Sequence, residues 1–187
     1  WLRSARRNCS GLLQHTRNDD MPTTSILLKS MEAIQTIIKA LNLTGIDSTN
    51  NILIRKVPRD IEKDMPPNVP AVDLTPAITP LPAILIAPIG AEQSDPLAGT
   101  LYRDQINYPI QILFYDQDNN DQELNADRYY LWRESVRRKL NNSRLSGVSE
   151  VVRVRIEPAE IVNPALWLKG RFAGGLKAIV TSRESRT

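Results

Sequence analysis

Apolar residues recur at intervals of three or four positions in two segments of the chain, which is the spacing of an amphipathic helix. The first helix is predicted over residues 25–42 and the second over residues 122–141. The apolar positions that define the first helix are Leu27, Met31, Ile34, Ile38 and Leu41, and those that define the second are Tyr129, Trp132, Val136 and Leu140.

Short apolar runs of a different spacing predict β-strands between and after the helices. Residues 90–105 are predicted as a polar loop, residues 116–121 as a turn that caps the second helix, and residues 159–170 as another loop. Pro109 is placed near the start of its strand, where a missing N–H is tolerable. The five predicted strands cover residues 52–57, 83–87, 108–115, 152–156 and 176–181.

This order of elements predicts an α/β (α+β) fold. We expect a mixed, mainly antiparallel sheet of about five strands flanked by the two main helices, with one long proline-rich loop. Residues 21–187 are predicted to form a single domain. Residues 1–20 begin with Trp and carry a surplus of arginine without any periodic pattern, so they are predicted to be a disordered or artefactual basic leader before a true start at Met21. The alternative is a basic arm that contacts nucleic acid or a neighbouring subunit.

The proline-rich loop covers residues 58–82 and contains seven prolines, which exclude a helix and disfavour a central strand. Loops of this length are uncommon in compact domains and are often functional. Because proline lowers the entropic cost of ordering a segment, we interpret the loop as a binding arm; the alternative is a tolerated surface insertion. Apolar side chains on such an arm are expected to be buried against another surface. This predicts a subunit contact through Ile61, Met65, Val69, Val72, Leu74 and Ile78.

The residue composition removes most catalytic arrangements from the predicted domain. The only cysteine, Cys9, and the only histidine, His15, both lie in the leader. The domain therefore has no thiol nucleophile, no Cys/His zinc site and no Ser–His triad. We predict no catalytic residue, no cofactor and no metal, and hence a protein that is not an enzyme. No apolar run approaches the length of a membrane span.

One acidic stretch partly matches a calcium-binding loop. Residues 116–121 place oxygen ligands at the right first positions, and Asp127 stands at position twelve. However, Asp121 replaces the glycine of position six, and position twelve normally holds a glutamate. The helix-capping turn is the simpler interpretation. Gly174 and Gly175 precede a predicted strand, which indicates a turn rather than a phosphate-binding loop.

A basic group lies in the C-terminal half of the second helix and just after it, formed by Arg133, Arg137, Arg138, Lys139 and Arg144. Such a group can contact phosphates. No stacking aromatic residues or base-reading module accompany it, so a subunit contact or a solvated face is favoured. Arg133, Arg137 and Arg138 are therefore candidate interface residues.

The chain resembles the tail terminator or tail-completion (neck) proteins of tailed bacteriophages in the order of its predicted elements and in the kinds of residue that form them. The segments that carry this resemblance are residues 52–58, 81–86, 108–118, 131–138 and 151–158. The resemblance covers roughly residues 25–182. It implies a virion subunit, assembled in the host cytoplasm, that forms a hexameric ring capping the tail tube and joining tail to head. It also implies contacts with the tail tube protein and head–tail connector proteins. DNA would pass through the lumen without sequence-specific binding, and no membrane would be involved. The alternatives are another neck or head–tail connector subunit, a nucleic-acid-binding accessory protein, and a carboxylate-based enzyme or calcium-binding module.

Overall fold

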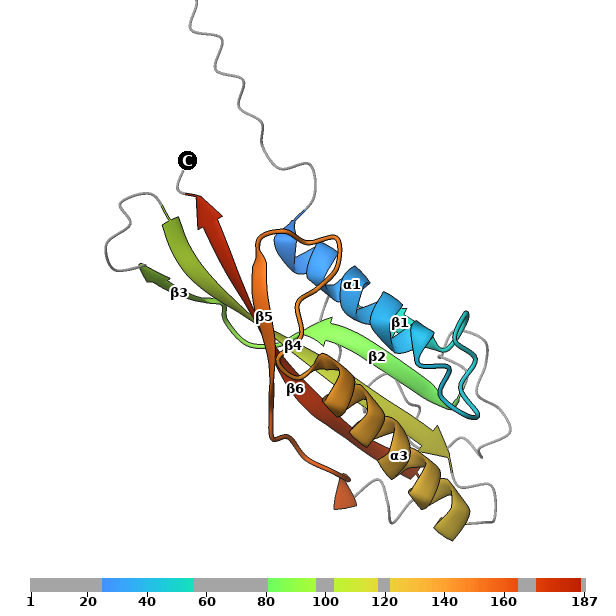
Figure 1. The fold of residues 1–187 in the computed structure, drawn as a ribbon. Helices are drawn as coiled ribbons and strands as arrows, with labels where there is room; N and C mark the ends of the chain where they lie inside the picture. Colours follow the sequence, from blue (N-terminus) through green and yellow to red (C-terminus); the bar gives the residue numbers. More distant parts are fainter. Residues whose placement is uncertain (1–24, 56–80, 97–102, 118–121, 165–170, 186–187) are drawn as a thin grey trace, which may run out of the picture.

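The structure, a computed structural model, describes residues 25–55, 81–96, 103–117, 122–164 and 171–185 (Figure 1). Within these residues two helices lie on one face of a six-stranded sheet. The sheet is mixed and mostly antiparallel, because only its first two strands run parallel to each other. The predicted α+β fold class is confirmed.

The elements follow the predicted order, with one additional short strand. The strand order in the sheet is β1-β2-β4-β6-β5, and β3 pairs with β4. The elements are α1 (Ile26–Ala40), β1 (Ile52–Ile54), β2 (Ala83–Pro88), β3 (Gln93–Pro96), β4 (Arg103–Gln117), α3 (Gln122–Leu140), β5 (Val151–Glu157) and β6 (Arg171–Ser185).

Helix α1 buries the apolar stripe that its sequence predicts. Met31, Ile34 and Ile38 are buried in the core, on the side of the helix that covers β1 and β2. Gln35 adds a polar contact between α1 and β1, because its side-chain amide donates a hydrogen bond to the Ile52 carbonyl at 2.6 Å. Burying this stripe, rather than helix propensity alone, stabilises α1.

Helix α3 covers the other half of the sheet. Tyr129, Trp132, Val136 and Leu140 are all buried, which confirms the predicted stripe. The indole N–H of Trp132 donates to the Thr44 carbonyl at 2.8 Å and so ties α3 to the segment between α1 and β1. The two helices therefore share one core with the sheet below them.

Strands β4 and β6 are much longer than predicted. Each spans 15 residues, and they pair with each other along their whole length. The predicted polar loop at 90–105 is wrong, because it contains β3 and the start of β4. Where residues 103–107 of β4 pair with residues 181–185 of β6, most side chains are polar, so apolar alternation does not mark these ends. At the start of β6, Phe172 and Ala173 are buried, but Gly174 and Gly175 interrupt the apolar pattern.

Pro109 lies in the middle of β4 and not near its start. On one side, β4 pairs with β3 up to Asn107 and with β2 from Ile110 onward. Pro109 falls at the change of partner, and its carbonyl accepts a hydrogen bond from the Ile89 N–H at 3.0 Å. A residue without an N–H is well suited to this junction.

Asp116 belongs to β4 rather than to the predicted turn. Its carboxylate is only 3% exposed and accepts a hydrogen bond from Arg128 Nη2 at 2.6 Å. The Arg128 guanidinium in turn lies 5.1 Å from the centroid of the Trp132 ring. The first oxygen ligand of the hypothetical calcium loop is thus engaged in an ion pair. Residues 118–121, the rest of that loop and the proposed cap, lie outside the described residues.

The face of the sheet opposite the helices has two chemically different halves. Near β1 and β2 it is apolar, and Ala83, Leu85 and Ala87 are buried there. Near β5 it is charged, with Arg153, Arg155 and Glu157 at alternating positions of β5 and with Lys177 and Arg183 on β6. No described helix covers this face (Figure 1). We call it the open face.

Candidate functional site

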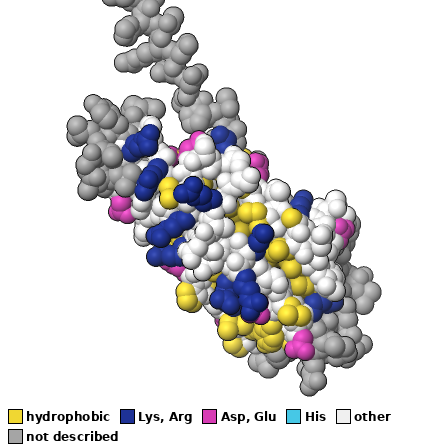
Figure 2. All heavy atoms as spheres, viewed as in Figure 1, with side chains coloured by type: hydrophobic (Ala, Val, Ile, Leu, Met, Phe, Trp, Pro, Cys, Tyr) yellow, Lys and Arg dark blue, Asp and Glu magenta, His cyan; other side chains and the backbone are white. Residues whose placement is uncertain are grey.

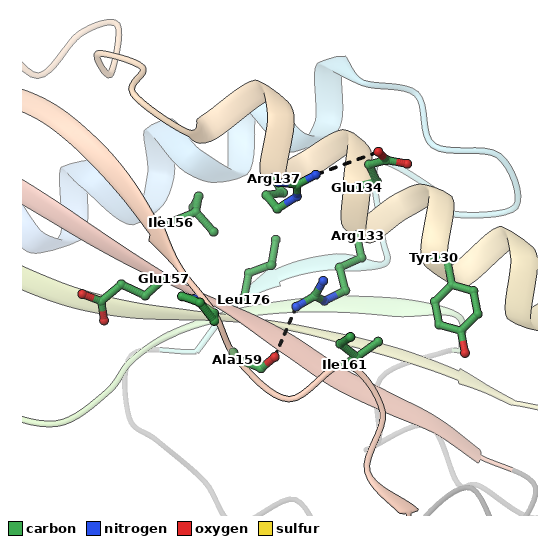
Figure 3. Close-up of a pocket in the computed structure, with 10 residues that line it drawn as sticks. Tyr130, Arg133, Glu134, Arg137, Ile156, Glu157, Ala159, Ile161 and Leu176 are labelled. Atoms are coloured by element: carbon green, nitrogen blue, oxygen red, sulfur yellow. Dashed lines mark hydrogen bonds and ion pairs between the residues drawn. The ribbon is translucent and has the colours of Figure 1, made fainter.

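The flank of α3 that faces away from the core borders a groove. Because Tyr129, Trp132 and Val136 point into the core, the residues at i, i+3, i+4 and i+7 from Tyr130 lie together on that flank. The chain that follows β5 runs opposite them (Figure 3). Between the two lies a cavity of about 710 Å³, which we call the α3 groove. It is lined by Tyr130, Arg133, Glu134, Arg137, Ile156, Glu157, Pro158, Ala159, Ile161 and Leu176.

Residues 159–163 form the wall of the groove opposite the helix. Backbone hydrogen bonds hold this wall beside β6. The Gly175 N–H donates to the Glu160 carbonyl at 2.9 Å, and the Asn163 N–H donates to the Ala173 carbonyl at 2.7 Å. The wall therefore prolongs, in a less regular form, the antiparallel pairing of β5 with β6.

Two side chains of α3 fasten the wall to the helix. The Tyr129 hydroxyl donates to the Ile161 carbonyl at 2.6 Å. The Arg133 guanidinium donates from Nη2 to the Ala159 carbonyl at 3.2 Å and from Nε to the Gly175 carbonyl at 3.3 Å. Figure 3 shows Arg133 reaching from the helix to this wall. The groove therefore has a fixed width, set by hydrogen bonds on both sides.

Gly174 allows the wall to lie this close to the sheet. The glycine is inside β6, so the predicted turn at Gly174 and Gly175 is wrong. A Cβ atom at Gly174 would collide with the Ile161 carbonyl and with the Tyr129 hydroxyl. Glycine in the interior of a strand often marks such a close backbone approach.

The three arginines predicted as interface residues occupy different places. Arg133 is engaged with carbonyl groups of its own chain. Arg137 lies at the groove with its side chain 51% exposed and only a loose ion pair, 3.9 Å from Glu134. Arg138 does not line the groove; it is 73% exposed and pairs with the same carboxylate at 2.7 Å. Arg137 is therefore the arginine best placed to receive an acidic group in the groove.

Large apolar side chains are exposed beside these charges. Tyr130 is 41% exposed, Ile161 53% and the neighbouring Leu131 62%, and they are the exposed large hydrophobic residues of the described chain. Figure 2 shows apolar side chains next to basic ones over α3. An apolar centre with a charged margin is typical of a protein docking surface.

Two ionisable groups at the groove have shifted pKa values. Burial raises the pKa of the Tyr129 hydroxyl, so it stays protonated and remains a hydrogen-bond donor. The hydrogen bond from Lys177 is the main cause that lowers the pKa of Glu157, with Arg155 adding to it. Among the described residues no cluster of three or more His, Cys, Asp or Glu is placed to hold a metal ion. None of the described helices is long and apolar enough to cross a membrane.

Sequence reasoning found only part of this site. The predicted interface residues Ile61, Met65, Val69, Val72, Leu74 and Ile78 lie outside the described residues. Tyr130 and Ile161 were not predicted. Tyr130 is next to Tyr129 of the buried stripe in the sequence. Its exposure depends on how α3 is rotated about its own axis against the sheet. Ile161 lies in a predicted loop, and the glycine at 174 was the one sequence signal of a close contact there.

The comparisons with known proteins add no family: no protein-family model matches the chain, and a search of the curated proteins finds no match.

Proposed function

We propose that this chain is a structural subunit of a tailed-bacteriophage neck, and specifically a tail terminator. In this proposal the subunits form a hexameric ring that caps the tail tube and joins the tail to the head. The observation that carries the proposal is the α3 groove, with Tyr130, Ile161 and Arg137 exposed around a cavity of about 710 Å³. Such a surface is suited to docking a protein segment.

The partner in the groove would be a neighbouring copy of the same subunit. An apolar side chain of the neighbour would lie between Tyr130 and Ile161, where it removes apolar surface from water. A carboxylate beside it would pair with Arg137. Ion pairs at such a margin fix register and specificity more than affinity. In a ring every subunit offers the same groove and the same inserting segment, so the contact repeats until the ring closes.

The remaining partners follow from the same proposal. The ring would contact the tail tube protein on one side and head–tail connector proteins on the other, in the neck of the virion. It would assemble in the host cytoplasm. Another connector ring of the neck could use the same groove between its subunits, and the two proposals differ in the partner ring that is bound.

Charge reversal at one of two neighbouring arginines tests the proposal. Arg137→Glu places a negative charge in the groove, whereas Arg138→Glu makes the same change on a residue that does not line it. Native mass spectrometry of the full chain, alone and with purified tail tubes, measures the ring. We expect Arg138→Glu to retain a hexamer that sediments with the tubes. We expect Arg137→Glu to remain a folded monomer.

Ile161→Glu tests the apolar part of the same contact and should have the same effect as Arg137→Glu. Circular dichroism and thermal melting verify that each variant is folded. A wild-type chain that remains monomeric in the presence of tail tubes would contradict the terminator proposal. A wild-type hexamer that binds connector proteins but not tubes would favour the other neck ring.

A further inference from the structure

The charged half of the open face carries a row of four cations. Arg153 and Arg155 are two positions apart on β5, and Lys177 and Arg183 lie on the neighbouring strand β6. The register places all four on the same face: Arg153 is opposite Thr181, Arg155 is opposite Ile179, and Glu157 is opposite Lys177. Val154 and Val180, which alternate with them, point into the core.

The four cations form a regular line. Residues two apart on a strand are separated by about 7 Å, and neighbouring strands by about 5 Å. The order along the line is Arg183, Arg153, Arg155 and Lys177, with steps of about 7–8 Å and a total length of about 20 Å. All four side chains reach solvent. Figure 2 shows basic side chains gathered along the β5 side of the molecule. We call this line the basic stripe.

Few negative charges oppose the basic stripe. Among the described residues of this face, Glu157 lies within the stripe and Asp95 lies on β3, beyond β4. Glu157 bonds both Arg155, at 2.6 Å, and Lys177, at 3.0 Å. The stripe therefore keeps a surplus of positive charge at its Arg153 and Arg183 end.

The surroundings of the stripe are mixed. The next strand places Gln105, Asn107 and Gln111 on the same face. A hollow of about 420 Å³ adjoins Arg155 and Lys177, and Ile89, Pro109 and Ile179 contribute apolar surface to its lining. The exposed large hydrophobic residues of the described chain, Tyr130, Leu131 and Ile161, belong to or adjoin the α3 groove and not this face.

We infer that the basic stripe binds the phosphate backbone of double-stranded DNA without reading its sequence. A protein partner would be favoured by exposed large apolar side chains, and the described residues of this face include none. A duplex carries about one negative charge per 1.7 Å of its axis with both strands counted, so about 20 Å of duplex holds about 12 phosphates, and the stripe faces those on one side. Arginine forks and side-chain amides are the usual donors to phosphate oxygens. The inference concerns the surface of a single subunit and does not rest on the proposed ring.

Salt-dependent binding of the full chain to DNA tests the inference. Fluorescence anisotropy of a labelled duplex, measured from 25 to 200 mM KCl (roughly the range over which phosphate contacts weaken), gives the slope of log affinity against log salt. The double variant R153A/R155A removes two phosphate contacts and should make that slope shallower by about 2. The loss should be the same for two duplexes of unrelated sequence. The double variant R138A/K139A on α3 removes as many cations at exposed positions that do not line the groove, and it should bind like the wild type.

Glu157→Gln provides a change of opposite sign. It removes the negative charge that neutralises Arg155 and Lys177, so DNA affinity should rise above that of the wild type. If the β5 and α3 double variants lost DNA affinity equally, binding would depend on net charge alone, and the inference would be overturned. An unchanged slope in R153A/R155A would also overturn it, because binding would then come from another part of the chain, such as the basic residues 1–20. Displacement of DNA by poly-glutamate at matched charge would overturn the inference too, because the stripe would then bind any polyanion.

Discussion

Replacement of Trp132 by alanine tests how the core joins α3 to the rest of the fold. The ring is 2% exposed, its N–H donates to the Thr44 carbonyl at 2.8 Å, and the Arg128 guanidinium lies 5.1 Å from its centroid. Removal of a large buried aromatic ring costs about 3–5 kcal/mol of unfolding free energy. The lost hydrogen bond adds about 1 kcal/mol. We therefore expect Trp132→Ala to lose about 4–6 kcal/mol.

Two companion variants separate these contributions. Trp132→Phe retains most of the apolar ring but removes the N–H, so it should lose about 1–2 kcal/mol. Leu131→Ala alters the adjacent residue, which is 62% exposed, and should change the unfolding free energy by less than about 0.5 kcal/mol. The three variants should therefore rank in the order Leu131→Ala, Trp132→Phe, Trp132→Ala.

Urea unfolding followed by far-ultraviolet circular dichroism measures this order. Circular dichroism is preferable to tryptophan fluorescence because Trp1 and Trp167 would contribute to the emission. For a chain of this length 1 kcal/mol corresponds to a shift of about 2–4 °C in Tm, so Trp132→Ala should melt roughly 8–24 °C lower. A loss below about 1 kcal/mol with an unchanged m-value would refute the reasoning, because a ring packed as described cannot be removed at so small a cost.

Two further predictions concern the α3 groove and the open face. Gly174→Ala should lose at least about 2 kcal/mol of unfolding free energy in urea titrations, because its Cβ collides with the Ile161 carbonyl and the wall must move. Gly175→Ala, at the next position of β6, meets its nearest atom only at 3.0 Å and should lose less. Burial raises the pKa of the Tyr115 hydroxyl to about 12 in the folded chain, against about 10 in the unfolded chain. The unfolded chain therefore loses this proton at a lower pH, and the free energy of unfolding should fall as the pH rises from about 10 to 12. Urea titrations at several alkaline pH values should show a smaller fall for Tyr115→Phe; an identical fall would contradict the burial.

The helices and the core were predictable because their signal is local. An apolar stripe such as Met31, Ile34 and Ile38 implies a buried helix face whatever lies opposite. The ends of β4 and β6 were not predictable in the same way. Gln105 and Arg183, for example, are polar on a polar face, and only the pairing of two distant strands makes them extended. Such pairing leaves no periodic pattern in either segment.

The α3 groove was only half predictable, for a related reason. The arginines of α3 are visible in the sequence, but their roles depend on what faces each of them. Arg133 and Arg137 are one helical turn apart, yet the first bonds one backbone carbonyl of the wall and one of β6 while the second reaches solvent. In these hydrogen bonds the wall itself contributes only backbone groups, which any residue type can supply. Gly174 is the exception, because the close approach excludes a side chain.

The end of β5 separates the two proposed surfaces. Glu157 borders the α3 groove on one side and the hollow of the basic stripe on the other. Its carboxylate bonds Arg155 and Lys177, and Figure 3 shows it pointing away from the groove. A subunit that closes a ring through the groove would therefore leave the stripe free to meet DNA. If so, Arg137→Glu should abolish the ring while a monomer still binds DNA with the salt slope of one stripe. R153A/R155A should still form the ring but lose the DNA contacts of the stripe. A variant at either surface that lost both the ring and DNA binding would show that the two surfaces are one.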